Sequence, residues 1–177
     1  MKKIKNNKDI NYSEDNDIIT TTPAGCMLVD ISKTKFDDER GYFIQLLQTG
    51  DKIKFDKFKQ INTSFSRKNV VRGMHNQIGQ EKLVYVVSGK IIDYVIKFAS
   101  NKKEQFLLTP NNYMLYIPGD CAHGFMALED SHIIYLTTEK YNSKESNDIN
   151  PASPCHIFPW TGQKDIIISK KDLAAEK

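Results

Sequence analysis

Short apolar runs separated by turn-forming residues fill the chain from about residue 18 onward. The runs are rich in Val, Ile, Tyr and Phe, and within several of them apolar and polar residues alternate. Such runs, recurring about every 8–12 residues, are typical of a β-sandwich or barrel. The predicted strands are residues 27–31, 42–47, 60–65, 82–87, 90–98, 105–109, 113–117, 124–128 and 132–138.

Turn signals divide these runs, and helix signals are few. Ser88-Gly89 separates residues 84–87 from 91–95 and predicts a β-hairpin. Residues 52–59 could form a short helix, and residues 169–176 a better one, because Ser169 can cap it. The pattern as a whole predicts an all-β protein: a cupin-type double-stranded β-helix, or jelly-roll barrel, with a few short helices.

The chain divides into a short extension and one domain. Residues 1–17 are polar, with alternating charge, and predict a flexible extension. Residues 18–177 are expected to form a single jelly-roll domain, because neither an internal repeat nor a domain-scale linker interrupts them.

Composition and charge exclude several classes of protein. Apolar residues make up 40% of the 177 residues and charged residues 27%, which is typical of a globular domain. The net charge is only +3, without a long basic run, so no nucleic-acid surface is expected. No stretch approaches the ~20 apolar residues of a membrane helix, and the N-terminus lacks a secretory signal. Cys26, Cys121 and Cys155 form no C-x-x-C pair and are expected to be buried or half-buried free thiols in a cytoplasmic protein.

A few polar residues in apolar surroundings are candidates for chemistry. Arg72 and His75 flank Gly73, but on a regular strand they would face opposite sides, so they converge only if the strand bulges or twists. His123 follows a Pro-Gly turn, where it could line the mouth of a barrel. Lys82 opens an otherwise apolar strand. Each of these residues, taken singly, is at least as well explained by a structural role.

Six motifs in fixed order are more specific than any single residue. Together they resemble the dTDP-4-dehydrorhamnose 3,5-epimerase family, a cupin-fold group, over about residues 22–175. The motifs are residues 38–43 (DERGYF), 60–67 (QINTSFSR), 71–77 (VRGMHNQ), 82–84 (KLV), 117–118 with 122–125 (IP and AHGF), and Tyr135 with Tyr141.

The resemblance implies a homodimer that inverts C3, C5 or both in a nucleotide-linked 4-keto-6-deoxy sugar, without metal or cofactor. His75 matches the catalytic base, Asp172 the acid that orients it, and Tyr135 the proton donor on the opposite face of the sugar. Lys82 matches a residue near the ketone oxygen. The matching substrate-binding positions are Arg72, Arg40, Gln60, Asn62, His123 and Tyr141. The implied pathway is deoxysugar biosynthesis for surface polysaccharide.

These residue types suit the chemistry. A hydrogen next to a ketone is acidic only if the developing enolate oxygen is stabilised, and a cation such as Lys82 can do this. A His is suited to remove the proton near neutral pH, and a carboxylate bonded to its second nitrogen fixes its tautomer. Inversion then requires a second acid on the other face.

Some positions depart from the family pattern and leave the nucleotide and the exact sugar open. Asn76 stands where Phe is usual, and Lys97 and Ala99 stand where Asp and Arg are usual. A metal-dependent cupin remains an alternative, with His75, Glu81 and His123 as an imperfect ligand set. A non-catalytic sugar-nucleotide binder, or another ketoisomerase on the same barrel, is a second alternative.

Overall fold

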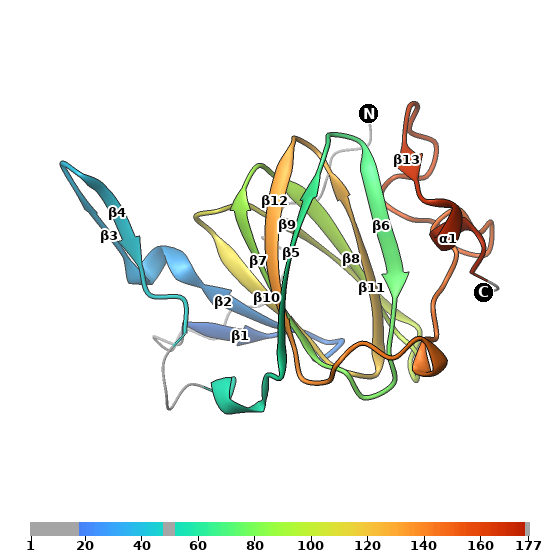
Figure 1. The fold of residues 1–177 in the computed structure, drawn as a ribbon, viewed down its shortest axis with the longest axis horizontal. Coiled ribbons are helices and arrows are strands. Elements are labelled where there is room, and N and C mark those ends of the chain that lie inside the picture. Colours follow the sequence, from blue (N-terminus) through green and yellow to red (C-terminus); the bar gives the residue numbers. More distant parts are fainter. Residues whose placement is uncertain (1–17, 48–51, 176–177) are drawn as a thin grey trace.

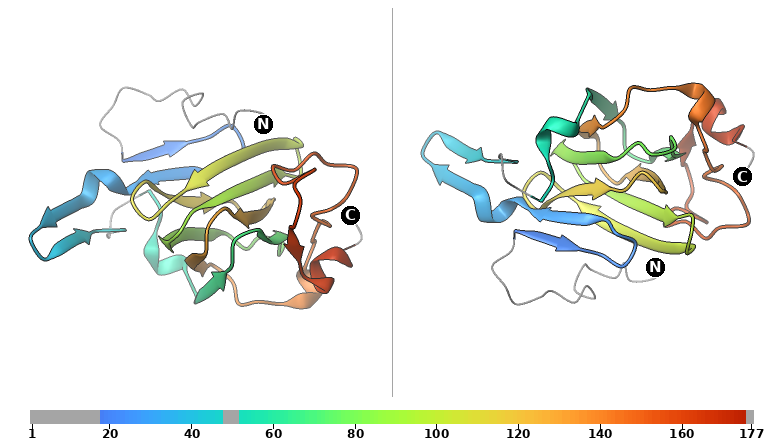
Figure 2. Two further views of the ribbon diagram at one scale, coloured as in Figure 1. Left: turned by 90° about the horizontal axis from the view of Figure 1, so that it is seen from above. Right: turned by 90° about the horizontal axis from the view of Figure 1, so that it is seen from below.

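The computed structural model of the protein describes residues 18–47 and 52–175 (Figure 1). The predicted N-terminal extension, residues 1–17, lies outside the described residues. The described chain forms two facing β-sheets and a separate two-stranded arm (Figure 2). The predicted all-β barrel is confirmed.

Strands from distant parts of the chain alternate in both sheets. Every strand pair is antiparallel except β13 with β6. The six-stranded sheet has the order β1 (Ile19–Thr21), β2 (Met27–Asp30), β10 (Tyr113–Ile117), β7 (Lys82–Ser88), β12 (Ser131–Thr137), β5 (Gln60–Ser66). The five-stranded sheet has the order β13 (Ile167–Ile168), β6 (Val70–His75), β11 (Cys121–Ala127), β8 (Ile91–Lys97), β9 (Lys102–Leu108).

The period-two pattern of the sequence sorts side chains between the barrel interior and its outer faces. On β7, Val84 and Val86 join the core between the two sheets, whereas Leu83 and Tyr85 pack on the outside. A second cluster on the outer face of the five-stranded sheet includes Trp160 from the C-terminal segment. Both faces of each sheet are therefore partly covered, which explains why the central strands are so apolar.

The Ser88-Gly89 turn does not form the predicted hairpin, so that prediction was wrong. β7 pairs with β10 and β12, while β8 pairs with β11 and β9, so the turn carries the chain from one sheet to the other. Gly89 has φ +82°, and a Cβ there would lie 2.2 Å from the carbonyl oxygen of Asp130. A turn that contains glycine can therefore connect strands of two different sheets as well as the two strands of a hairpin.

Most predicted strands are confirmed within a few residues, but four were missed. The missed strands are β1, β3 (Lys35–Asp38), β6 and β13. β3 and β4 (Gly41–Ile44) form the arm that projects from the barrel (Figure 1). Single 3₁₀ turns occur at Ile31–Thr34, Phe55–Lys57 and Ser143–Glu145.

The helix predictions differ in outcome. Residues 52–59 contain only the 3₁₀ turn Phe55–Lys57. The C-terminal helix α1 is shorter than predicted, Lys170–Leu173, but Ser169 caps it as expected by accepting a hydrogen bond from the backbone N–H of Asp172. All three cysteines are free: Cys26 and Cys121 are buried, whereas Cys155 is exposed, contrary to expectation.

Gly89→Ala should destabilise the fold more than Gly79→Ala does. Both glycines have positive φ, but a Cβ at Gly79 meets no atom within 4 Å, so it costs only backbone strain of about 1 kcal/mol. A Cβ at Gly89 would also collide with backbone, adding about 1–3 kcal/mol. Urea unfolding of the two variants measures the difference, and equal free energies of unfolding would contradict the close approach seen at Gly89.

Candidate active site

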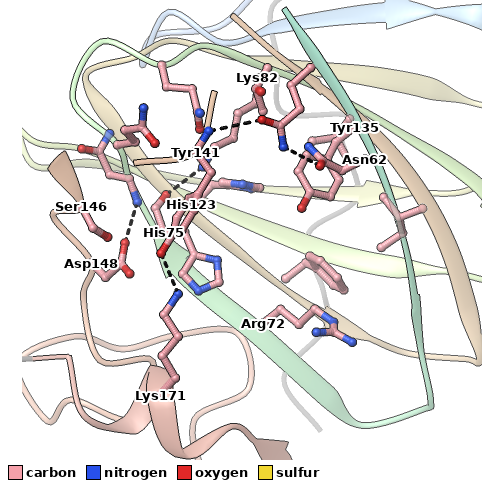
Figure 3. Close-up of a pocket in the computed structure, with 18 residues that line it drawn as sticks. Asn62, Arg72, His75, Lys82, His123, Tyr135, Tyr141, Ser146, Asp148 and Lys171 are labelled. Carbon is pink, nitrogen blue, oxygen red and sulfur yellow. Dashed lines mark hydrogen bonds between the residues drawn. The ribbon is translucent and has the colours of Figure 1, made fainter. Parts of the chain in front are cut away.

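A pocket of about 400 Å³ opens between the two sheets at one end of the barrel (Figure 3). Both sheets and the following loops contribute side chains to it. The six-stranded sheet contributes Gln60, Asn62, Lys82, Val84, Ile133, Tyr135 and Thr137; the five-stranded sheet contributes Arg72, His75, His123 and Phe125; loops and α1 contribute Asn76, Gln77, Gln80, Tyr141, Ser146, Asp148 and Lys171.

A register shift in β6 brings Arg72 and His75 to the same side. His75 lies opposite His123 on β11, and Arg72 lies opposite Phe125, so β6 spans three residues where β11 spans two. One extra residue in a strand reverses the alternation of side chains beyond it. Arg72 and His75 therefore both line the pocket, as the sequence analysis required of a bulged strand.

His75 is held by a carboxylate from the far end of the chain. Its Nε2 lies 2.9 Å from Oδ1 of Asp172 on α1, and the second oxygen of Asp172 accepts a hydrogen bond from the backbone N–H of Gly73 at 3.4 Å. Burial alone would raise the pKa of Asp172, but the hydrogen bond and charge of His75 outweigh it and hold that pKa below its usual value. The Asp172 side chain thus contacts β6 through His75 and the Gly73 backbone.

Lys82 is the buried cation of the pocket. It is only 8% exposed, and its Nζ donates a hydrogen bond to the carbonyl oxygen of His75 at 3.2 Å. Burial lowers the pKa of Lys82 to about 8, although the carboxylates of Asp93 and Asp148 oppose the shift. Lys82 therefore exchanges its proton much closer to neutral pH than an exposed lysine does.

His123 and Asp93 form a second pair behind the pocket. Nδ1 of His123 lies 3.3 Å from both carboxylate oxygens of Asp93, which is fully buried. Burial, followed by the charge of Lys82, lowers the pKa of His123. Asp93 was not predicted, and a single carboxylate in the apolar run of β8 was the signal that could have identified it.

Tyr135 faces the pocket from the sheet opposite His75 (Figure 3). It lies opposite Asn62 on β5, and the side-chain oxygen of Asn62 accepts a hydrogen bond from Gln60 at 2.7 Å. Gln60 in turn accepts a hydrogen bond from the backbone N–H of Tyr141 at 3.2 Å. Nζ of Lys171 donates to the Tyr141 hydroxyl at 3.2 Å, at the rim.

Arg40 is the one predicted site residue that lies away from the pocket of its own chain. It sits at the turn of the β3–β4 arm, its side chain is 85% exposed, and it forms an ion pair with Asp38 (Figure 1). Arg40 therefore does not line the pocket of its own chain, and its role in substrate binding stays a prediction. The local motif around Arg40 does not predict the direction in which the β3–β4 arm projects from the barrel.

The other predicted residues all contribute to the pocket, Asp172 through its contact with His75. Among the charged side chains that line the pocket, Asp148 and Lys171 were not predicted. Asp148 lies in a polar loop with no distinguishing pattern, whereas Lys171 directly precedes Asp172 and could have been suspected from that position.

The ligand set considered for a metal-dependent cupin is not formed. Glu81 does not line the pocket and forms an ion pair with Lys57 instead. Across residues 18–47 and 52–175, no three His, Cys, Asp or Glu side chains are grouped as metal ligands would be.

In the same part of the chain, no helix has the length and apolar character needed to cross a membrane.

Comparison with known proteins places the chain in a family. The family model described as dTDP-4-dehydrorhamnose 3,5-epimerase matches residues 21–177. The chain belongs to the dTDP-4-dehydrorhamnose 3,5-epimerase family. This membership confirms the resemblance seen in the motifs, together with the jelly-roll fold and the epimerase class predicted from it.

Relatives of that name are similar along most of this chain. A dTDP-4-dehydrorhamnose 3,5-epimerase from Methanothermobacter thermautotrophicus is 32% identical over 171 residues, which cover 87% of this chain and 90% of the relative. One from Neisseria gonorrhoeae is 33% identical over 153 residues and 80% of this chain. That match covers 47% of the Neisseria protein, so the chain spans about half of its length.

Solved structures agree with this assignment. The dTDP-4-dehydrorhamnose 3,5-epimerase from Sulfolobus tokodaii superimposes with a TM-score of 0.78 at 34% identity, covering 89% of this chain and 92% of that one. A dTDP-6-deoxy-D-glucose-3,5-epimerase from Legionella pneumophila, in complex with dTDP-4-keto-L-rhamnose, gives 0.77 at 27% identity, covering 89% and 90%.

The pKa of Lys82 leads to a pH prediction for this epimerase. The predicted role of Lys82 at the ketone oxygen requires a protonated lysine, so kcat/KM should fall as the pH rises through about 8. In Lys82→Arg the guanidinium stays charged, so this basic limb should disappear, although the larger group lowers the maximum rate. Lys90→Arg, at an exposed ion pair with Glu129, is the matched control. A wild-type profile that stays level to pH 10 would contradict a role for the Lys82 charge.

Proposed function

We propose that the protein inverts C3, C5 or both in a nucleotide-linked 4-keto-6-deoxy sugar. One observation carries the proposal: His75 and Tyr135 reach one pocket from opposite sheets, beside the buried cation Lys82. An epimerase needs a base on one face of the sugar, an acid on the other and a positive charge at the ketone oxygen. The arrangement meets all three requirements.

In the proposed reaction, His75 is the base. Its Nε2 is engaged by Asp172, which leaves Nδ1 to accept the proton next to the ketone. Among the described residues, Nδ1 has no hydrogen-bond partner that would compete. Asp172 fixes the tautomer and stabilises the imidazolium that forms after proton transfer.

Lys82 and Tyr135 complete the proposed proton exchange. The Lys82 ammonium stabilises the negative charge that develops on the ketone oxygen when the proton leaves. The Tyr135 hydroxyl then delivers a proton to the carbon from the opposite sheet, which inverts its configuration. An enolate can form towards C3 or towards C5, because both carbons adjoin the C4 ketone, and in either enolate the negative charge develops on the same C4 oxygen.

The proposed substrate is linked to dTDP. The ligand of the Legionella structure is dTDP-4-keto-L-rhamnose, and the family description names the same nucleotide. Arg72 is the proposed partner of the diphosphate. Among the residues that the structure describes, its guanidinium is bonded only to the neutral groups Ser66 Oγ and Phe65 O, so no carboxylate there competes with a phosphate. Gln60, Asn62, His123 and Tyr141 are proposed to contact the substrate. We place the enzyme in the cytoplasm, in deoxysugar biosynthesis for surface polysaccharide.

Exchange of substrate hydrogens in deuterated water tests the proposal. His75→Asn should lower exchange at C3 and C5 by roughly a hundred- to ten-thousandfold, because the base is lost. Tyr135→Phe should keep exchange but lose inversion, since the proton returns only from the original face. Asp172→Asn should slow exchange less than His75→Asn. NMR of the dTDP-linked 4-keto-6-deoxy sugar follows each carbon separately.

Matched controls separate these effects from damage to the fold. His132→Asn replaces a histidine bonded to Thr63 outside the pocket, and Tyr85→Phe replaces a tyrosine on the outer face of β7. Both should exchange and invert at the wild-type rate. If His75→Asn exchanged hydrogens at the wild-type rate, His75 would not be the base. If the wild-type protein exchanged no hydrogen, the proposed function would be wrong.

The protein is also proposed to be a homodimer. The β3–β4 arm carries three aromatic side chains, Phe36, Tyr42 and Phe43, which are 54–65% exposed in the single chain. Exposed apolar side chains gathered on a projecting arm favour contact with a second copy. The strand β1, at the edge of the six-stranded sheet, offers unpaired backbone groups for the same purpose.

Light scattering at micromolar concentration should therefore report a dimer. The double variant Phe36→Ser/Phe43→Ser should shift the mass toward the monomer, because it removes apolar contact area from the arm. Ile157→Ser is the control, since Ile157 is 82% exposed in the C-terminal segment, far from the arm in the fold. A wild-type protein that is monomeric under these conditions would contradict the proposal.

A further inference from the structure

The loop after β12 runs antiparallel to the end of β6 and places a carboxylate beside His75. Met74 and Ile149 exchange both backbone hydrogen bonds, and Gln77 forms a bridge with Ser146. This register makes Asp148 the direct neighbour of His75 across the strands. Because the pair lies between hydrogen-bonded positions, its side chains are close, and both line the pocket (Figure 3).

Asp148 has one oxygen available to a ligand. Its Oδ1 accepts a hydrogen bond from the backbone N–H of Asn76 at 3.1 Å. Within the described part of the chain, Oδ2 has no hydrogen-bond partner, and no other carboxylate lines the pocket. Asp172 and Asp93 are instead engaged by His75 and His123. The wall beside the proposed base therefore presents one half-buried, negatively charged acceptor.

Within the hexose that would lie over His75, only one edge suits such an acceptor. An ionised carboxylate requires a hydrogen-bond donor, and it repels the diphosphate on C1. The C5 side of a 4-keto-6-deoxy sugar carries a methyl group and the ring oxygen, neither of which donates. The opposite edge carries the hydroxyls of C2 and C3. The ketone oxygen between them is excluded too, because it needs a cation.

We infer that Asp148 binds the hydroxyl-bearing C2–C3 edge of the sugar and thereby sets how the ring lies over His75. The inference rests on the proposed function, since it assumes a 4-keto sugar whose ketone oxygen faces Lys82. With the ketone near Lys82 and the C2–C3 edge at Asp148, C5 and its methyl group lie on the side away from the β6–loop pair. Asp148 is thus a specificity residue for sugars that keep these hydroxyls.

Asp148→Asn and Asp148→Ala test this contact. Asn can still accept the bond from the Asn76 N–H, so the loop stays paired, but it lacks the charged second oxygen. A hydrogen bond to a charged group contributes a factor of roughly ten to a hundred. Both variants should therefore lose about that factor in kcat/KM and in affinity for the parent dTDP-4-keto-6-deoxy sugar.

Deoxy analogues show whether the loss comes from the sugar edge. The ratio of wild type to Asp148→Asn should fall to about one for the 2-deoxy or the 3-deoxy analogue, since the donor is already missing. Glu145→Gln, three residues earlier and outside the pocket, is the control and should match wild type on all three sugars. Thermal unfolding of each variant shows that the fold is retained.

The outcomes separate the two proposals. If the ratio is the same for the parent sugar and both analogues, Asp148 acts through the fold or its general charge, and the inference is wrong. It is equally wrong if Asp148→Asn matches wild type on the parent sugar. If wild type exchanges no hydrogen at all, the proposed function fails. Dissociation constants for the three sugars, measured by calorimetry, then still decide whether Asp148 contacts the hydroxyl edge.

Discussion

Between Arg72 and His75, β6 carries one residue more than the stretch of β11 that pairs with it. In a regular strand the two side chains would lie on opposite faces, one in the pocket and the other in the outer cluster around Trp160. The bulge instead sends Arg72 and His75 inward, while Val71 and Met74 pack outward. Three contacts depend on the His75 side chain lying on the pocket face. There His75 binds Asp172, faces Tyr135 across the pocket and lies beside Asp148.

The shift is possible because β6 and β11 approach each other closely at a pair of glycines. A Cβ at Gly73 would lie 2.4 Å from the Cα of Gly124. Gly73 also has φ +131°, a conformation that other residues rarely adopt. The glycine between Arg72 and His75 is therefore part of what positions the proposed base, although it contributes no chemical group.

One end of the barrel interior is apolar and the other is charged, and the charged groups are stabilised by one another. Buried charges are costly unless paired, and Asp93 with His123 and Lys82 meets that condition. Each lies on an inward position of its strand, among residues such as Val84 and Phe125. Burial lowers the pKa of Lys82 to about 8, and burial also lowers the pKa of His123.

The class of fold, most of the strands and eight of the eighteen residues that line the pocket could be predicted from the amino-acid sequence. Alternation is a local property, so a strand such as β7 is visible without knowing its neighbours. It could not determine strand partners, because the Ser88-Gly89 turn fits a hairpin and a crossing equally well. Nor could it reveal β6, where Arg72 and Gly73 interrupt the apolar pattern. The structure was needed to show that Arg40 lies outside the pocket of its own chain and that Asp148 lies beside His75. The contact of Asp172 with His75 was implied by the family resemblance but by no local pattern. Those contacts join residues up to about a hundred positions apart, and their geometry depends on register and loop pairing rather than on any local pattern.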